Sequence, residues 1–157
     1  MYKNFDLSLG QISTIFFDVD GTFTDGSLYF MDNGSSMTKF NVYDGMGCIL
    51  LEEAGLELLI LTARHSDAVV KRFKELGITK IFTKVLKKRD FIKDYLKSHD
   101  LAKHEVAFMG DDLQDLAAIN EVGVFFTSSN AIDKVKESAH YVTLRSGGNG
   151  AVREISD

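Results

Sequence analysis

Short apolar runs that alternate with helical patterns are the feature that most restricts the fold of this 157-residue chain. Within most runs the apolar residues stand at consecutive positions, which is typical of parallel strands that are buried on both faces. Alternation of such strands with helices favours an α/β fold with a parallel sheet, right-handed crossovers and helices on both faces. We expect strands at residues 12–17, 58–61, 80–82, 106–109, 124–127 and 141–144.

Helical patterns fill the intervals between these runs. Ser66 is placed to cap one helix and Gly77 is placed to end it. The apolar residues of this helix are Val69, Val70, Phe73 and Leu76, and the apolar face of the next helix consists of Phe91, Ile92, Tyr95 and Leu96. A third helix begins with Leu113, Leu116 and Ala117 and ends near Gly123.

One segment departs from the alternation. Residues 27–31 and 36–40 flank the turn sequence Asp32-Asn33-Gly34-Ser35, which predicts a β-hairpin. The hairpin follows an acidic loop that begins at Asp18. We therefore expect a flap at about residues 27–40 that projects over the same end of the sheet as this loop.

The composition is that of a chain that can fill its own core. With 45% hydrophobic and 26% charged residues it needs no disulfide or metal for stability, and its length predicts a single domain, residues 1–157. The net charge of −5 argues against nucleic-acid binding, which requires a basic surface. No apolar run is long enough to span a membrane.

The cysteine content and the first residues favour a cytoplasmic protein. The start MYKNFDLSLG lacks the apolar segment of a secretory signal. The single Cys48 cannot form an internal disulfide, which fits a reducing compartment. We expect Cys48 to be a small buried residue on a helix rather than a nucleophile.

Two carboxylates stand where the first apolar run ends. If that strand ends near Asp18, the following loop carries Asp20 over the carboxyl end of the strand, where open α/β sheets build their sites. Two acids beside such a run are costly unless a cation or a proton-transfer task keeps them there. A solvated turn is the alternative, because Asp-Gly is a common turn dipeptide.

Three further polar signals follow later strands or connections. Thr62 ends the run Leu-Leu-Ile-Leu, Lys88 begins a helical pattern, and Gly110-Asp111-Asp112-Leu-Gln-Asp115 follows the strand at 106–109. Each has an ordinary alternative: a helix cap for Thr62, a solvated charge for Lys88, and an N-cap for either of the first two acids of the last motif. Together with the first pair of acids, and in this order, they suit phosphoryl transfer.

Phosphoryl transfer requires residue types of this kind. A carboxylate can attack phosphorus and form an aspartyl-phosphate, and a second acid protonates the leaving alkoxide and then deprotonates water. Because phosphate and nucleophile are both negative, a cation is required, and carboxylate and carbonyl oxygens suit Mg²⁺. Hydroxyl and ammonium groups can hold the remaining phosphoryl oxygens.

These four motifs resemble those of the haloacid dehalogenase (HAD) superfamily of phosphatases over nearly the whole chain. The resemblance implies a three-layer, Rossmann-like HAD fold. It implies that Asp18 is the nucleophile and a Mg²⁺ ligand, and that Asp20 is the general acid/base and offers its carbonyl oxygen to the metal. The other implied roles are phosphoryl binding by Thr62 and Lys88, metal binding by Asp111, and orientation of the metal surroundings by Asp112 and Asp115.

HAD enzymes usually carry a cap domain between the first and second motifs or between the second and third. Here the first interval has room for the hairpin and one helix, and the second has room for one helix and one strand, so we expect no cap domain. Phosphoryl transfer benefits from a dry, enclosed site. Either a macromolecular substrate covers the site or neighbouring subunits serve as the cap.

Further segments resemble the 3-deoxy-D-manno-octulosonate 8-phosphate (KDO 8-phosphate) phosphatase family: Asp-Gly-Thr-Phe-Thr-Asp-Gly at 20–26, residues 40–47 and the glycine-rich tail at 145–154. Members are small, capless tetramers in which hairpins and tail help to complete a neighbour's site. The resemblance implies a homotetramer that hydrolyses a sugar-acid phosphate with Mg²⁺, in the KDO branch of lipopolysaccharide synthesis.

The same resemblance implies a set of substrate contacts. Arg64 and Arg72 suit a sugar-acid phosphate because a guanidinium pairs bidentately with carboxylate or phosphate. An exposed helix position is the alternative for Arg72. The full set is Asp20, Asn41, Val42, Tyr43, Asp44, Gly45, Thr62, Ala63, Arg64, Arg72 and Lys88. The chain departs from the family at Ala63, where glycine is usual, and at Arg89, where an apolar residue is common.

Three alternatives stay open on the sequence alone. The substrate can be a nine-carbon, sialic-acid-type 9-phosphate or a phosphoprotein, or the chain can be a non-catalytic HAD-like module beside a nucleotide-sugar synthetase. The intact motif residues argue against a non-catalytic module, and Arg64 favours the eight-carbon substrate.

Overall fold

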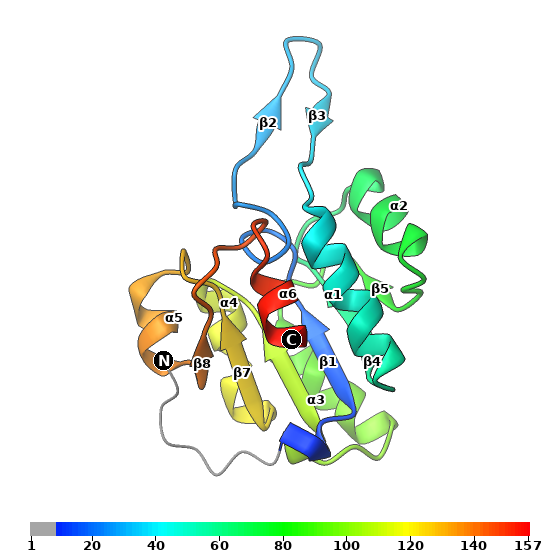
Figure 1. The fold of residues 1–157 in the computed structure, drawn as a ribbon, viewed down its shortest axis with the longest axis vertical. Helices are drawn as coiled ribbons and strands as arrows, with labels where there is room; N and C mark the ends of the chain where they lie inside the picture. Colours follow the sequence, from blue (N-terminus) through cyan, green and yellow to red (C-terminus); the bar gives the residue numbers. More distant parts are fainter. Residues whose placement is uncertain (1–8) are drawn as a thin grey trace.

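The computed structural model describes residues 9–157 and contains one parallel sheet of six strands in the order β5-β4-β1-β6-β7-β8 (Figure 1). Each strand pairs in parallel with its neighbours. The predicted α/β fold with a central parallel sheet is confirmed. The strands of this sheet are β1 (Thr14–Phe17), β4 (Glu57–Leu61), β5 (Ile81–Phe82), β6 (Val106–Met109), β7 (Val124–Thr127) and β8 (Tyr141–Val142).

The predicted strands differ from the observed ones only at their ends. β6 and β7 have the predicted bounds, whereas β1 begins two residues later and β8 ends two residues earlier than expected. Phe16, Leu59 and Phe108 in the central strands are completely buried. The consecutive apolar runs therefore correspond to strands that are covered on both faces, as predicted.

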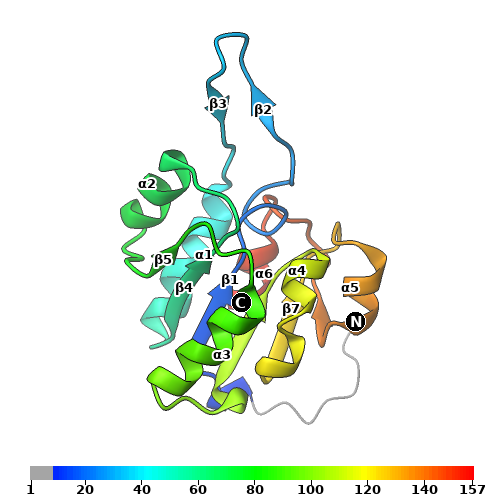
Figure 2. The same cartoon turned by 180° about the vertical axis from the view of Figure 1, so that it is seen from behind.

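Helices cover both faces of the sheet (Figures 1 and 2). One face packs against the first, second and last helices through side chains such as Cys48, Phe73 and Val152. The other face packs against the third to fifth helices, where Ile92 and Val135 are completely buried. The helices are α1 (Val42–Glu53), α2 (Asp67–Glu75), α3 (Lys88–Ser98), α4 (Leu113–Leu116), α5 (Asp133–Ser138) and α6 (Ala151–Ser156), with 3₁₀ turns at Leu9–Gln11, Lys103–Glu105 and Ile119–Glu121.

The helix α2 begins and ends where the sequence predicts. Ser66 is the N-cap residue, although its side chain makes no capping hydrogen bond. Gly77 lies just beyond the helix with φ of 90°, a left-handed conformation that glycine adopts without steric cost.

The helix α4 is shorter than the sequence predicts and buries an acidic residue. Leu113 is 50% exposed and Ala117 is exposed, whereas the acidic Asp115 is buried and Leu116 is half-buried against the core. The buried carboxylate accepts hydrogen bonds from Lys88 and from backbone N–H groups, which offset the loss of hydration. The predicted end of this helix near Gly123 is wrong, because α4 ends at Leu116 and a separate 3₁₀ turn follows at Ile119–Glu121.

The predicted β-hairpin consists of β2 (Tyr29–Phe30) and β3 (Ser36–Met37), which pair antiparallel. Gly34 in its turn has φ of 81°. Figure 1 shows the hairpin standing away from the body of the molecule, beyond the carboxyl ends of the strands. Figure 1 shows the hairpin as the part of residues 9–157 that projects farthest beyond that edge, with α2 beside its base.

The order of the strands identifies where a ligand site is expected. From β1 the chain passes through α1 to β4 and through α2 to β5, and then returns through α3 to β6 on the other side of β1. The carboxyl ends of β1 and β6 therefore form a topological switch point, where open α/β sheets bind ligands. Asp18 follows β1 at this point, and Gly110 follows β6.

Three further expectations concern the cysteine, a membrane-spanning helix and a secretory signal. Cys48 is completely buried in α1, as predicted, and this burial raises its pKa to about 12. No helix within residues 9–157 combines the length and the apolar character needed to cross a membrane. The absence of a secretory signal was predicted from a segment whose first eight residues lie outside the described part of the chain.

The buried positions of the sheet generate a stability prediction. We expect Leu59→Ala, at a completely buried site, to lower the free energy of unfolding by about 2–5 kcal/mol, because it leaves a cavity in the core. Leu86→Ala, at a site that is 71% exposed, is the matched control and should change it by less than about 0.5 kcal/mol. Urea unfolding followed by circular dichroism measures both, and equal effects would contradict the assignment of the core.

Candidate active site

A cavity of about 320 Å³ lies at the carboxyl ends of β1, β4 and β6. The structure brings seven of the sequence-predicted residues to it from four separate parts of the chain: Asp18, Asp20, Thr62, Lys88, Asp111, Asp112 and Asp115. Ala63 and Arg64 line it as well. Sequence reasoning missed Gly26 and Gln114, which also line the cavity; the position of Gln114 beside Asp115 in the acidic motif is the signal that identifies it.

The first two acids occupy different environments. Asp18 follows the last residue of β1, its backbone N–H donates to the carbonyl of Met109 on β6, and its side chain is buried. The turn that follows is closed by the carbonyl of Val19, and Gly21 has φ of 82°. This turn places Asp20 in a half-buried position at the mouth of the cavity.

Lys88 lies between two buried carboxylates. Its Nζ atom is 2.5 Å from Oδ1 of Asp18 and 2.5 Å from Oδ1 of Asp115, and all three side chains are buried. Burial acts to lower the pKa of Lys88, but the charges of the two carboxylates outweigh it and raise that pKa. Lys88 is therefore a cation at neutral pH, and it joins the first and last predicted motifs.

Asp115 organises the loop that carries the other acids. Its Oδ2 accepts hydrogen bonds from the backbone N–H groups of Asp111 and Asp112, at 3.0 and 3.2 Å. A side chain at Gly110 would overlap that of Asp115, so only glycine fits there. The carboxylate of Asp112 caps α4 by accepting from the N–H of Leu113. The orienting role of Asp115 that the resemblance implies stays a prediction, which these hydrogen bonds support.

Three carboxylates are placed to hold a metal ion. Oxygen atoms of Asp18, Asp111 and Asp115 all lie within 4.8 Å of one another. Burial, together with the charge of Asp115, raises the pKa of Asp18 well above its usual value, and the same causes raise the pKa of Asp111 to about 7. Lys88 supplies one positive charge for three acids. This oxygen-only, electron-rich donor set fits a hard divalent cation. The carboxylate of Asp20 is not part of the cluster.

The second motif supplies a hydroxyl and a guanidinium. Thr62 follows β4, is buried, and accepts a hydrogen bond at Oγ1 from the N–H of Arg64. The Arg64 side chain is half exposed, and its Nη1 atom is 3.5 Å from Oδ1 of Asp20. Arg64 thus lies beside the second acid, where a negatively charged part of a substrate can reach it.

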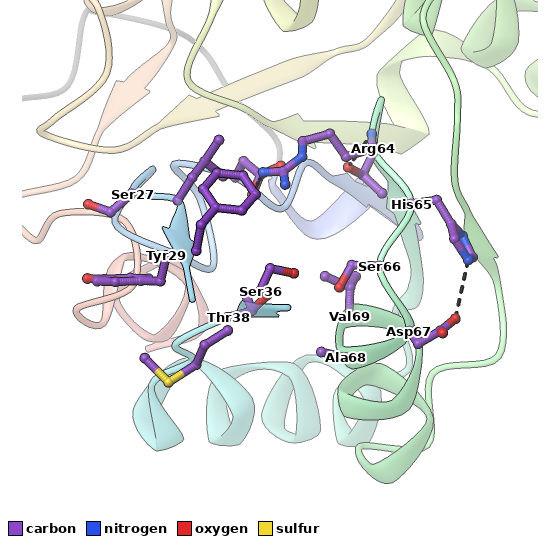
Figure 3. Close-up of a pocket in the computed structure, with 15 residues that line it drawn as sticks. Ser27, Tyr29, Ser36, Thr38, Arg64, His65, Ser66, Asp67, Ala68 and Val69 are labelled. Atoms are coloured by element: carbon purple, nitrogen blue, oxygen red, sulfur yellow. Dashed lines mark hydrogen bonds and ion pairs between the residues drawn. The ribbon is translucent and has the colours of Figure 1, made fainter. Parts of the chain in front are cut away.

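A second cavity of about 350 Å³ opens between the hairpin and the start of α2 (Figure 3). It shares Asp20, Thr62 and Arg64 with the acidic cavity. Figure 3 shows residues of the hairpin facing residues 64–69 across this space, with His65 paired to Asp67. The sequence identified the hairpin as a specificity element but not the lining hydroxyls of Ser27, Ser36, Thr38 and Ser66.

The remaining predicted substrate contacts line neither cavity of the same subunit. Asn41 caps α1, Gly45 packs beneath the guanidinium of Arg72, and Arg72 pairs with Glu75 at 3.8 Å. Val42 and Tyr43 are 74% and 59% exposed. Asp44 is 1% exposed, and its carboxylate already accepts three backbone hydrogen bonds. Contacts of these six residues with a substrate stay a prediction, and this structure provides no such contact within one subunit.

Comparison with known proteins shows the family of the chain. Residues 77–155 match the haloacid dehalogenase-like hydrolase family. The chain is 35% identical to the 3-deoxy-D-manno-octulosonate 8-phosphate phosphatase of Haemophilus influenzae, over 95% of this chain and 83% of that protein, and 36% identical to that of Escherichia coli K12, over 94% and 78%.

Solved structures of phosphatases from the same family are also similar to this chain. The phosphatase of Moraxella catarrhalis, in complex with a magnesium ion, a phosphate ion and KDO, superposes with a TM-score of 0.89 at 35% identity, covering 93% of this chain and 84% of that one. The cobalt-bound Haemophilus influenzae enzyme superposes with a TM-score of 0.87 at 35% identity, covering 94% and 86%.

The raised pKa of Asp111 predicts a stability change without metal. Its folded pKa of about 7 exceeds the ordinary 3.8, so the folded state binds the extra proton and stability falls as pH rises from about 4 to about 7. At pH 8 without metal, Asp111→Asn should therefore raise the free energy of unfolding by about 1 kcal/mol or more, which is about 2–4 °C in Tm.

The same variant should lose most of the stabilisation that added Mg²⁺ gives the original chain, because one metal ligand is removed. Thermal unfolding with EDTA and with Mg²⁺ measures both effects. Asp133→Asn, at an exposed carboxylate on α5, is the matched control and should change neither. A lower Tm of Asp111→Asn in EDTA would contradict the assigned electrostatics.

Proposed function

Because the chain belongs to the KDO 8-phosphate phosphatase family of haloacid dehalogenase-like hydrolases, we propose that it hydrolyses KDO 8-phosphate to KDO and phosphate with Mg²⁺. The observation that carries this proposal is the convergence of Asp18, Asp20, Thr62, Lys88 and Asp111 in one cavity at the switch point of the sheet. They come from four separate segments of the chain, and no single structural role requires all of them.

Asp18 is the nucleophile in this proposal. One of its carboxylate oxygens attacks phosphorus, the bond from phosphorus to the sugar oxygen breaks, and an aspartyl-phosphate forms. Its burial favours the neutral acid, which is a poor nucleophile, but the ammonium of Lys88 at 2.5 Å favours the carboxylate. Lys88 thereby opposes the effect of burial on the nucleophile and also neutralises part of the phosphoryl charge.

Asp20 is the general acid and base. It donates a proton to the departing sugar oxygen, and its carboxylate then takes a proton from the water that attacks the aspartyl-phosphate, which releases phosphate and restores Asp18. Asp20 lines both cavities. It therefore stands between the phosphoryl position and the space that would hold the sugar, where the leaving oxygen must lie.

Asp18 and Asp111 would hold Mg²⁺ together with the backbone carbonyl of Asp20, while Asp112 and Asp115 orient the surrounding loop. Bound there, the ion offsets the like charges of phosphate and carboxylates and polarises the phosphoryl group. The hydroxyl of Thr62 and the ammonium of Lys88 bind the remaining phosphoryl oxygens. Arg64, beside the sugar cavity, suits the carboxylate of the sugar acid.

A homotetramer would enclose this open site. The hairpin exposes large apolar side chains that a monomer leaves in water, among them Leu28 at 52%, Phe30 at 70% and Met31 at 53%. We propose that the hairpin of a neighbouring subunit covers the site and that residues 41–43, Gly45 and Arg72 reach the substrate only in that assembly. We also propose a cytoplasmic enzyme of lipopolysaccharide synthesis that binds neither nucleic acid nor membrane.

The decisive experiment is a phosphatase assay on sugar-acid phosphates with and without Mg²⁺. We expect the original chain to prefer KDO 8-phosphate over nine-carbon keto-acid 9-phosphates and hexose phosphates. Asp18→Asn should lower kcat by about 10³-fold or more, because the nucleophile is lost, whereas Asp133→Asn should not change it. Retained Mg²⁺-dependent phosphate release by Asp18→Asn would exclude the reaction class, and another preferred substrate would exclude the assignment to KDO.

Asp20→Asn should show a dependence on the leaving group. The alkoxide of KDO is strongly basic and needs a proton in order to leave, whereas p-nitrophenolate leaves without one. We therefore expect kcat/KM, which covers the steps up to leaving-group departure, to fall about 10²–10⁴-fold for KDO 8-phosphate and much less for p-nitrophenyl phosphate. Equal losses for both substrates would contradict the role of Asp20 as general acid.

The oligomeric state has its own test. Light scattering after size-exclusion chromatography should give four times the chain mass of 17.5 kDa. Phe30→Lys, which places a charge on the exposed apolar surface of the hairpin, should reduce that mass and raise KM for KDO 8-phosphate. A fully active monomer would contradict the neighbouring subunit as cap and favour a macromolecular substrate.

A further inference from the structure

The glycine-rich segment before α6 lies directly against the loop that carries Asp20. Gly147 and Gly148 are buried, and a Cβ atom at Gly147 would overlap the carbonyl of Gly21. A Cβ atom at Gly148 would lie 2.6 Å from the carbonyl carbon of Thr24. Backbone therefore packs on backbone here, and only glycine permits the approach. The family resemblance suggested that this tail serves a neighbour's site, but these residues contact the loop of their own subunit.

Hydrogen bonds fix the two segments to each other. The N–H of Gly148 donates to the carbonyl of Thr22 at 3.1 Å, and the hydroxyl of Ser128 donates to the carbonyl of Gly21 at 3.1 Å. The N–H of Gly147 donates to Oδ1 of Asn130 at 2.7 Å. The two carbonyl groups that follow Asp20 in sequence are thus held by residues that line neither of the two cavities.

Asp44 holds the other end of the glycine-rich segment. Its Oδ2 accepts from the N–H of Gly150 at 3.1 Å, and its Oδ1 accepts from the N–H groups of Val152 and Arg153 at 2.9 and 3.3 Å. The Nδ2 group of Asn41 donates to the carbonyl of Gly148 at 3.3 Å. Hydrogen bonds with the first residues of α1 therefore hold the segment that packs against the loop after β1.

The burial of Asp44 is not explained by its own helix. A carboxylate that is 1% exposed loses its hydration, and the three backbone donors of the tail, with the charge of Arg145, compensate for that loss. An apolar residue at this buried position would lose no hydration and would need no hydrogen-bond donors. Figure 1 shows the arrangement: the segment before α6 rises to the loop after β1, and α6 descends beside α1, which follows the hairpin.

We propose that Asp44 is a positioning residue for Asp20. It fixes residues 146–153, these fix the turn from Gly21 to Thr24, and the turn sets how far Asp20 reaches toward the leaving oxygen. Asp44 touches neither substrate nor metal in this role. The proposal rests on the proposed phosphatase activity. The resemblance implies that Asp44 contacts the substrate, whereas in this proposal its side chain contacts only its own subunit. A displacement of about 1 Å at a catalytic group can cost about 10²-fold in rate.

Asp44→Asn tests the proposal with little change in shape. One carboxylate oxygen becomes an NH₂ group that faces an N–H donor, so at least one of the three hydrogen bonds is lost. We expect kcat/KM for KDO 8-phosphate to fall about 10–100-fold, through kcat with KM unchanged. The loss for p-nitrophenyl phosphate should be much smaller, because that substrate does not need the proton from Asp20. The variant thus reproduces, in weaker form, the dependence on leaving group expected of Asp20→Asn.

Glu121→Gln is the matched control. Glu121 is also a buried acid, held by Arg89 and Lys103 away from the site, so its replacement weakens the fold without moving the Asp20 loop. It should leave the ratio of the two kcat/KM values unchanged. If Asp44→Asn does not fold, Asn130→Ala removes the acceptor for Gly147 at the other end of the segment, and it should show the same dependence on leaving group.

The outcomes separate this proposal from the proposed function. Equal losses for the two substrates, or no loss, in a folded Asp44→Asn or Asn130→Ala variant would overturn the positioning role while Asp20→Asn still shows its effect. If the original chain releases no phosphate from either substrate, the proposed function itself fails and the positioning role fails with it.

Discussion

The ammonium of Lys88 between the carboxylates of Asp18 and Asp115 is the interaction on which the rest of the site depends. Each carboxylate alone would be costly to bury, and two carboxylates at this separation would repel each other. The charge of Lys88 offsets both the cost of burial and the repulsion. Because Lys88 is the first residue of α3, it also links the end of β1 and the loop after β6 to that helix. The surplus of negative charge that remains is what suits the site to a divalent cation and a phosphoryl group.

The chemistry and the recognition of substrate occupy adjoining spaces that meet at Asp20. In the acidic cavity, Asp18 and Thr62 follow buried strands, and Lys88 bonds Asp18 to Asp115. The cavity beside it is bounded on one side by a hairpin that stands in solvent, with little of its own chain behind it. The acidic motif residues thus follow strands of the sheet, whereas the hairpin beside them leaves the second cavity open. This openness is why we propose that a neighbouring subunit encloses the substrate.

The elements best predicted from the sequence are those in which local pattern and burial agree. β6 and β7 were predicted to the residue because each is a short apolar run between turns. The length of α4 was mispredicted, because the helix expected to run to near Gly123 ends at Leu116. Local pattern also gives no sign that Asp115 is buried, since its bonds to Lys88 and to the backbone of Asp111 depend on the tertiary structure. A residue's partners from elsewhere in the chain are invisible to local periodicity.

The sequence by itself determined the parallel α/β fold, the hairpin and the motif residues of the acidic cavity, because strand-end carboxylates have few other uses. Only the tertiary structure decided which residues support them. Asp44 belongs to a segment that resembles a substrate-binding motif, yet it is buried under the tail, and the tail lies behind the loop of Asp20. These contacts join residues about a hundred positions apart, and such proximity arises only when the sheet and its helices have assembled.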